Sequence, residues 1–123
     1  GKVKAIWLLN HFDALDEQML ATIYNDNEPV IKEQIISIIG LRPNISDQMA
    51  ANLIKGATDS NSRVRFLTAI TFGTDNKEKW LPYLAKIAQK DASDPWTRAA
   101  VMTALNGQEI EFLKILEAES FDQ

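Results

Sequence analysis

The side chains best suited to chemistry lie close together near the start of the chain. The single histidine, His11, is followed by Asp13 and Asp16. Imidazole and carboxylate groups at this spacing can bind a metal ion or transfer protons. One histidine without histidine partners is nevertheless a poor metal site. We therefore interpret His11 as part of a helix end or turn, and Asp13, Asp16 and Glu17 as acids that favour a helix start through its dipole.

Motifs for phosphate and acyl chemistry are absent from the sequence. Neither G-x-x-x-x-G-K-[ST] nor G-x-G-x-x-G occurs, so nucleotide hydrolysis has no support. No G-x-S-x-G elbow presents a serine nucleophile. The absence of cysteine excludes disulfides, thiolate metal sites and a cysteine nucleophile. We expect no catalytic residues, no bound metal and no cofactor in this chain.

Three tryptophans are the next candidates, because tryptophan is enriched at binding hot spots. Large aromatic side chains also fill the space between stacked helices, and we expect core packing for Trp7 and Trp80. Trp96 is the expected exception. It lies at a helix start between Pro95 and Arg98, where one edge of the ring can stay exposed.

Composition limits the class of protein. The 123 residues suffice for one domain with a core, and the apolar and charged fractions of 46% and 24% are those of globular proteins. The net charge of −4 argues against a dedicated nucleic-acid surface. No apolar run is long enough to span a bilayer, so we expect no membrane contact from this segment, and no leader precedes the first helix.

An internal repeat organises the sequence. Two markers give its period: Val30, Val64 and Thr97 are separated by 34 and 33 residues, and three glycines by 33 and 34 residues. The segments that carry them are VIKEQIISIIG at 30–40, VRFLTAITFG at 64–73 and TRAAVMTALNG at 97–107. Apolar residues at helical spacing predict that each is a buried helix. We expect its glycine to end the helix in the left-handed conformation, at Gly40, Gly73 and Gly107.

Second helices alternate with these repeated ones. Their apolar stripes are Leu15, Met19, Leu20 and Ile23, then Ile45, Met49, Leu53 and Ile54, then Trp80, Leu81, Leu84 and Ile87. Asp26, Asp59 and either Asp91 or Asp94 are expected to end them. Pro82 is expected in a first helical turn, where proline is tolerated.

The sequence therefore predicts an all-α fold, an alpha-alpha superhelix of about eight helices in antiparallel pairs. Residues 1–123 form one domain with units at roughly 14–40, 45–73 and 77–107. Partial units occupy 2–12 and 108–121. Neither end has the polar face of a capping repeat, so we expect a fragment of a longer chain.

An acidic turn followed by Val-Arg and a helix of small apolar residues resembles the HEAT repeat, a relative of armadillo repeats. DSNSRVRFLTAITFG at 59–73 resembles it best, and Asp94 to Val101 is similar with Thr97 in place of valine. The copy at 26–40 departs from the pattern, with Ile31 at the arginine position and Lys32 one place later.

The HEAT resemblance implies a role for two arginines that lie 33 residues apart, Arg65 and Arg98. They would donate hydrogen bonds to turn aspartates of adjacent units, with Asp59 and Asp91 or Asp94 as candidates. Such charge-assisted bonds fix the geometry of a stack. The departure at Ile31 implies that this ladder is interrupted in the first copy.

A narrower resemblance covers most of the chain. The order AIWLLNHFDALDEQML, NDNEPVIKEQ, DPWTRAAVMTAL looks like the HEAT segment of large bacterial putative membrane-bound dehydrogenases, which join a propeller to a haem-binding region. This resemblance implies a periplasmic or cell-surface location, and without it we expect a cytoplasmic one. The oxidoreductase chemistry would belong to neighbouring domains, because this chain has no CxxCH haem motif.

These patterns favour a non-catalytic scaffold, spacer or protein-interaction module whose partner is a protein or a neighbouring domain of the same chain. One alternative is a HEAT-like DNA-base glycosylase or DNA-binding module, and another is a HEAT-type chromophore or haem chaperone. We expect the repeated helices to line a concave binding face. Its candidate residues are Lys32, Arg65, Trp96 and Arg98, together with Glu33, Thr68 and Thr103.

Overall fold

The computed structural model describes residues 1–26 and 28–120, and this part of the chain is all-helical. Residue 121, the last of the final predicted unit, lies outside it. Within the described ranges there are eight α-helices and one turn of 3-10 helix, so the all-α class and the number of helices are confirmed. The helices are α1 (Lys2–His11), α2 (Glu17–Asp26), α3 (Pro29–Leu41), α4 (Asp47–Ala57), α5 (Ser62–Asp75), η1 (Glu78–Trp80), α6 (Leu81–Lys90), α7 (Pro95–Leu105) and α8 (Glu109–Ser120).

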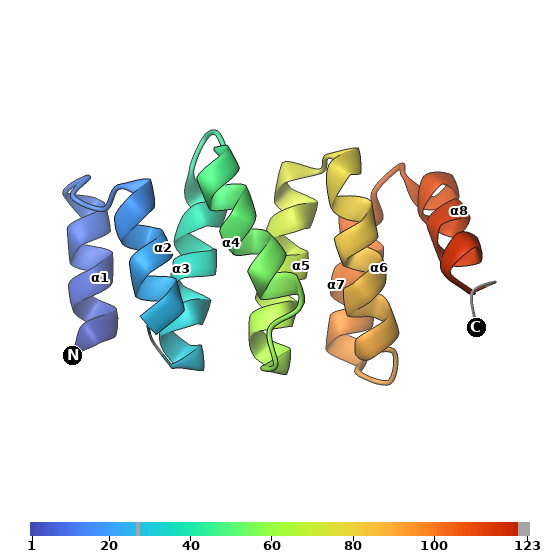
Figure 1. Cartoon of the computed structure of the whole chain (residues 1–123), viewed down its shortest axis with the longest axis horizontal. Helices are drawn as coiled ribbons and strands as arrows, with labels where there is room; N and C mark the ends of the chain where they lie inside the picture. Colours follow the sequence, from blue (N-terminus) through green and yellow to red (C-terminus); the bar gives the residue numbers. More distant parts are fainter. Residues whose placement is uncertain (27, 121–123) are drawn as a thin grey trace.

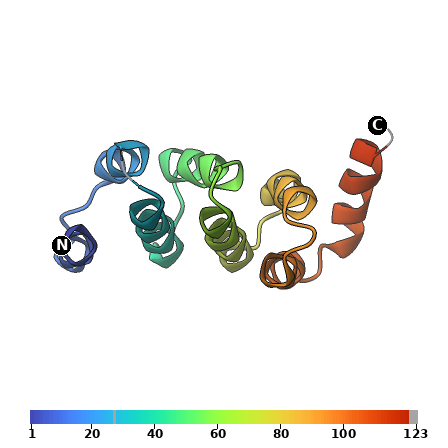
Figure 2. The same ribbon diagram turned by 90° about the horizontal axis from the view of Figure 1, so that it is seen from below.

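The helices lie in two rows, and the two ends of the described chain are far apart (Figure 1, Figure 2). Helices α1, α3, α5 and α7 contact one another in succession and form what we call the odd row. In the even row, α2 contacts α4, α4 contacts α6, and α6 contacts α8. Short connections join the rows, so that neighbouring helices run antiparallel. None of the described helices is long and apolar enough to cross a membrane.

Helix starts follow the local chemistry of the sequence. Pro29 and Pro95 are the first residues of α3 and α7, and Pro82 lies in the first turn of α6 as expected. The Asn61 side chain caps α5 by accepting hydrogen bonds from two backbone amides at 3.0 and 3.1 Å. Asp94 caps α7 in the same way. Asp94 therefore begins a helix and does not end one, and the residue that follows α6 is Asp91.

The core runs between the two rows for the length of the stack. Helix α3 is buried on several sides, with Ile35, Ile36, Ile38 and Ile39 all inaccessible to solvent. Phe72 of α5 stacks on Trp80 with ring centroids 4.6 Å apart. The expected core position of Trp80 is therefore confirmed, and its indole donates a hydrogen bond to the Asp75 carboxylate at 2.7 Å.

The three periodic glycines do not share one backbone conformation. Gly107 has a φ of +88° just after α7, as predicted. Gly40 and Gly73 are helical residues without positive φ, so the prediction that they end their helices in the left-handed conformation is wrong. Helix α5 continues past Gly73 and ends at Asn76, which has a φ of +50°.

Close contact between odd-row helices explains the two helical glycines. A Cβ atom at Gly73 would lie 2.9 Å from the Cα atom of Ala104 on α7. At Gly40 it would lie 3.3 Å from the Thr71 hydroxyl on α5. The glycine period therefore marks where each odd-row helix meets the next one.

Replacing Gly73 by alanine tests this packing role. Alanine favours an isolated helix by about 1 kcal/mol over glycine, yet its methyl group would meet the α7 backbone. We expect Gly73→Ala to lower the free energy of unfolding by about 1–3 kcal/mol, measured by urea denaturation followed by circular dichroism. Gly40→Ala is the matched control. It meets a side chain that can move, so we expect a smaller loss or a gain, and equal losses at both sites would contradict the assignment.

Candidate functional site

A buried ion pair joins one helical pair to the next. Arg65 on α5 is only 5% exposed. Its Nε and Nη2 atoms donate to Oδ2 and Oδ1 of Asp91 at 2.7 and 2.8 Å, and Nη1 donates to the backbone oxygen of Asp59 at 2.8 Å. The hydrogen bonds to Asp91 raise the pKa of Arg65 despite its burial. This guanidinium is thus committed to a contact between helical pairs.

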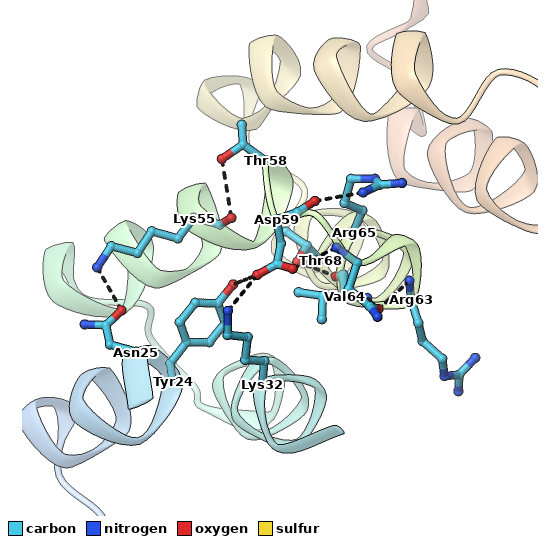
Figure 3. A network of polar contacts seen from close by, with 11 residues as sticks. Tyr24, Asn25, Lys32, Lys55, Thr58, Asp59, Arg63, Val64, Arg65 and Thr68 are labelled. Atoms are coloured by element: carbon cyan, nitrogen blue, oxygen red, sulfur yellow. Dashed lines mark hydrogen bonds and ion pairs between the residues drawn. The ribbon is translucent and has the colours of Figure 1, made fainter. Parts of the chain in front are cut away.

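A second polar cluster lies one unit earlier, around Asp59 (Figure 3). Lys32 of α3 places Nζ 3.2 Å from Oδ2 of Asp59, and the Tyr24 hydroxyl donates to the same oxygen at 3.1 Å. The backbone amide of Asn61 donates to Oδ1 at 2.9 Å. Three elements and the α4–α5 turn therefore meet at one carboxylate.

Protonation within this cluster follows from its contacts. Burial raises the pKa of Asp59, but the bonds from Asn61, Lys32 and Tyr24 lower it further, and the net result lies below the ordinary value. Burial and the neighbouring carboxylate raise the pKa of the Tyr24 hydroxyl. Tyr24 therefore stays a hydrogen-bond donor, and Asp59 stays a charged acceptor at neutral pH.

The two ion pairs occupy equivalent positions of the repeat. Helices α3, α5 and α7 begin at residues 29, 62 and 95, which are 33 apart. Lys32, Arg65 and Arg98 are therefore each the fourth residue of their helix. The prediction that Ile31 fills the arginine position, and that the first copy lacks the cation, is wrong.

The error came from the choice of anchor residue. Ile31 is the residue equivalent to Val64 and Thr97, and all three are buried. Val30 is 48% exposed. Two adjacent β-branched residues begin α3, and apolar character alone does not tell which of them faces the core.

Arg98 differs from the other two cations. Its side chain is exposed, and it forms no hydrogen bond or ion pair with residues 1–26 or 28–120. Neither aspartate that the resemblance offers is its partner, because Asp91 binds Arg65. Asp94 accepts bonds from the backbone amide of Trp96 and from the Thr97 hydroxyl.

The predicted binding residues therefore separate into two groups. Arg65 and Thr68 are buried and Lys32 is engaged with Asp59, so the prediction that these residues line an open face is wrong. Trp96, Arg98 and Thr103 are exposed. Trp96 is 76% exposed, more than the single exposed edge we expected. The structure does not bring Trp96 together with Lys32 or Arg65 at one site.

A groove of about 420 Å³ lies beside Trp96, between α5 and α7. Phe66 and Ile70 line one wall from α5, and Trp96 and small residues of α7 line the other. Its floor is Gly73 and Ala104, the two residues in closest contact between these helices. An apolar concave surface with an exposed indole is suited to accept an apolar side chain.

The preceding junction of the odd row shows why the groove is apolar. Between α3 and α5, Arg63 donates to the Glu33 carboxylate at 2.7 Å across the two helices. The residues one period later, 33 positions on, are Phe66 for Glu33 and Trp96 for Arg63. An ion pair at one junction is thus replaced by two aromatic side chains at the next. Sequence reasoning singled out Trp96 but missed Phe66, whose signal was this shared spacing.

The remaining chemical candidates lie in structural positions. His11 is the last residue of α1, where we expected a helix end. The Trp7 indole is partly buried and donates to the Gln34 side chain at 2.8 Å. Among the described residues, no three acidic or histidine side chains gather as metal ligands would.

Comparison with known proteins adds no identification. The chain gave no match to protein-family models, to curated proteins or to solved structures. Its function must therefore be argued from its own residues.

The lowered pKa of Asp59 predicts a pH-dependent contribution to stability. That contribution is complete above the unfolded-state pKa and is lost as the pH falls through the lower folded-state value. We expect Asp59→Asn to reduce the free energy of unfolding at neutral pH by about 1–3 kcal/mol, and the difference from wild type to shrink below about pH 4. Urea denaturation over a pH series measures this.

Asp26→Asn is the control for the Asp59 experiment. Asp26 is exposed at the end of α2. Its replacement should change the free energy of unfolding by less than about 0.5 kcal/mol at either pH. A loss in Asp59→Asn that stays constant from neutral to acidic pH would show that the charge of this carboxylate is not what stabilises the cluster.

Proposed function

We propose that this chain is a HEAT-type stack of helical hairpins that serves as a non-catalytic protein-interaction and spacer module. One observation carries the proposal: in two successive units, the fourth residue of the odd-row helix binds an aspartate of the following turn, as Lys32 binds Asp59 and Arg65 binds Asp91. Ion pairs repeated at one period define a stack of like units, and stacks of this kind present extended surfaces.

The non-catalytic part of the proposal rests on how the charged groups are used. A catalytic acid, base or nucleophile must be free to reach a substrate. Arg65 and Asp91 saturate each other in the interior, and the Asp59 carboxylate accepts three hydrogen bonds from its own chain. These groups hold the units together.

The interaction part rests on the groove beside Trp96. We propose that a protein segment places an apolar side chain there, against Phe66 and Ile70. The partner belongs to another protein or to a neighbouring domain of a longer chain, as in the bacterial dehydrogenase-type proteins that this sequence resembles. Tryptophan at the centre of such a contact commonly dominates the binding energy.

Removing one whole period tests the repeat architecture. Deletion of residues 43–75 takes out α4 and α5 and joins α3 to the turn before α6. The new neighbours should fit, because Gly40 would meet Ala104 and Lys32 would meet Asp91 by the same period. We expect a shorter helical protein that unfolds cooperatively at a lower temperature, since fewer interfaces remain. Circular dichroism during heating measures this.

Deletion of residues 43–60 alone is the matched control. It removes fewer residues, yet it takes out α4 and leaves α3 followed directly by another odd-row helix. We expect this variant to lose its cooperative transition. An unfolded product from the larger deletion would contradict a stack of interchangeable units.

Peptide selection tests the groove. Peptides from a random displayed library, selected on the immobilised chain, should carry an apolar anchor residue. Their affinity should fall about tenfold or more in Trp96→Ala, because a hot-spot residue contributes about 2 kcal/mol. Met102→Ala is the matched control, since Met102 is also on α7 and is 72% exposed but does not line the groove.

Three outcomes would contradict the proposal. Peptide binding that ignores Trp96 would remove the groove as the site. Tight binding to duplex DNA with a steep salt dependence would favour the nucleic-acid alternative. A changed haem absorbance spectrum after mixing with the chain would favour the haem-chaperone alternative.

A further inference from the structure

The turn between α7 and α8 contains a chemically unusual dipeptide. Asn106 is followed by Gly107, and it is the only asparagine in the sequence that precedes a glycine. After every other asparagine, a side chain at the next residue crowds the backbone nitrogen. Glycine has no Cβ, so its nitrogen is open to approach.

The surroundings of this dipeptide leave room for reaction. Both residues are exposed and lie outside the helices, and no heavy atom lies within 4 Å of the position that a Gly107 Cβ would occupy. The turn is also held in place. The backbone amide of Gln108 donates to the Leu105 oxygen at 2.7 Å, and the Gln108 side chain donates to Asn76 at 2.8 Å.

A carboxylate lies beside the Gly107 amide. The backbone N–H of Gly107 donates to Oε1 of Glu109 at 3.2 Å. A carboxylate in this position can accept the amide proton as a general base, which makes the nitrogen a better nucleophile. Exposure, the missing Cβ and the carboxylate thus coincide at one peptide bond.

We propose that Asn106 is a site of spontaneous deamidation and isoaspartate formation, promoted by Glu109. The Gly107 nitrogen forms a bond to Cγ of Asn106, and the bond from Cγ to Nδ2 breaks. The amide proton passes through Glu109 to the leaving nitrogen, which departs as ammonia. Water then opens the resulting succinimide ring: cleavage at Cγ gives aspartate, and cleavage at the backbone carbonyl carbon gives isoaspartate.

The products alter the junction between α7 and α8. Both add a negative charge next to Glu109, and isoaspartate also adds one methylene to the main chain within the turn. Helix α8 packs on α6 through contacts that depend on this turn, among them the buried Phe112 and the bond from Gln89 to Glu119 at 2.6 Å. Isoaspartate at residue 106 therefore loosens α8 from the stack.

Incubation of the purified chain at physiological pH and temperature tests the proposal. Tandem mass spectrometry of proteolytic fragments should show a gain of one dalton at Asn106 before any other asparagine, with isoaspartate and aspartate both present. Amide hydrogen exchange in α8 should rise in the fraction that carries isoaspartate. No conversion at Asn106, or faster conversion at another asparagine, would overturn the proposal.

Glu109→Gln separates the role of the fold from that of the dipeptide. Glutamine can still accept the Gly107 hydrogen bond but is not a base, so conversion in the folded chain should be several-fold slower than in wild type. In urea, where the turn is lost, the two chains should convert at the same rate. Equal rates in the folded state would remove Glu109 from the mechanism, and a difference that persists in urea would do the same. Asn106→Gln should abolish conversion at this position.

Discussion

The stack depends on the buried ion pair between Arg65 and Asp91. A charged guanidinium is strongly disfavoured in the interior unless each of its donors is satisfied. Asp91 supplies two acceptors from the end of α6, and the Asp59 backbone supplies a third from the turn before α5. These three bonds fix the position of α6 relative to α5. Once the arginine is buried, few orientations of the next helical pair remain acceptable.

Packing and electrostatics agree along the odd row. The Gly73 contact with Ala104 lets α5 and α7 approach closely, and the ion pair fixes their register against α6. One unit earlier, Lys32 and Asp59 take the same positions with the help of Tyr24. A lysine forms fewer directed bonds than an arginine, and the additional tyrosine donor satisfies the same carboxylate oxygen.

Much of the fold was predictable, because helix starts depend on local chemistry. Pro29, Pro95 and the cap at Asp94 begin helices wherever they occur in such a sequence. The roles of Gly40 and Gly73 were not predictable in this way, since a glycine near a helix end fits both a left-handed cap and a close helix contact. The choice between Val30 and Ile31 likewise depends on which direction the neighbouring row occupies. For the binding surface, the exposure of Trp96 followed from its place in the chain, whereas its pairing with Phe66 is a contact between helices.

The two-row arrangement also bears on how quickly the chain acquires its structure. Most of its contacts join helices that are adjacent, or next but one, along the sequence, so little loop-closure entropy is lost when each contact forms. Chains of this topology have low contact order and fold rapidly. The isoleucines of α3 are the most completely buried group of neighbours in the stack and pack against helices on both sides. Folding is therefore expected to nucleate around α3 and to spread outward in both directions, one helical pair at a time.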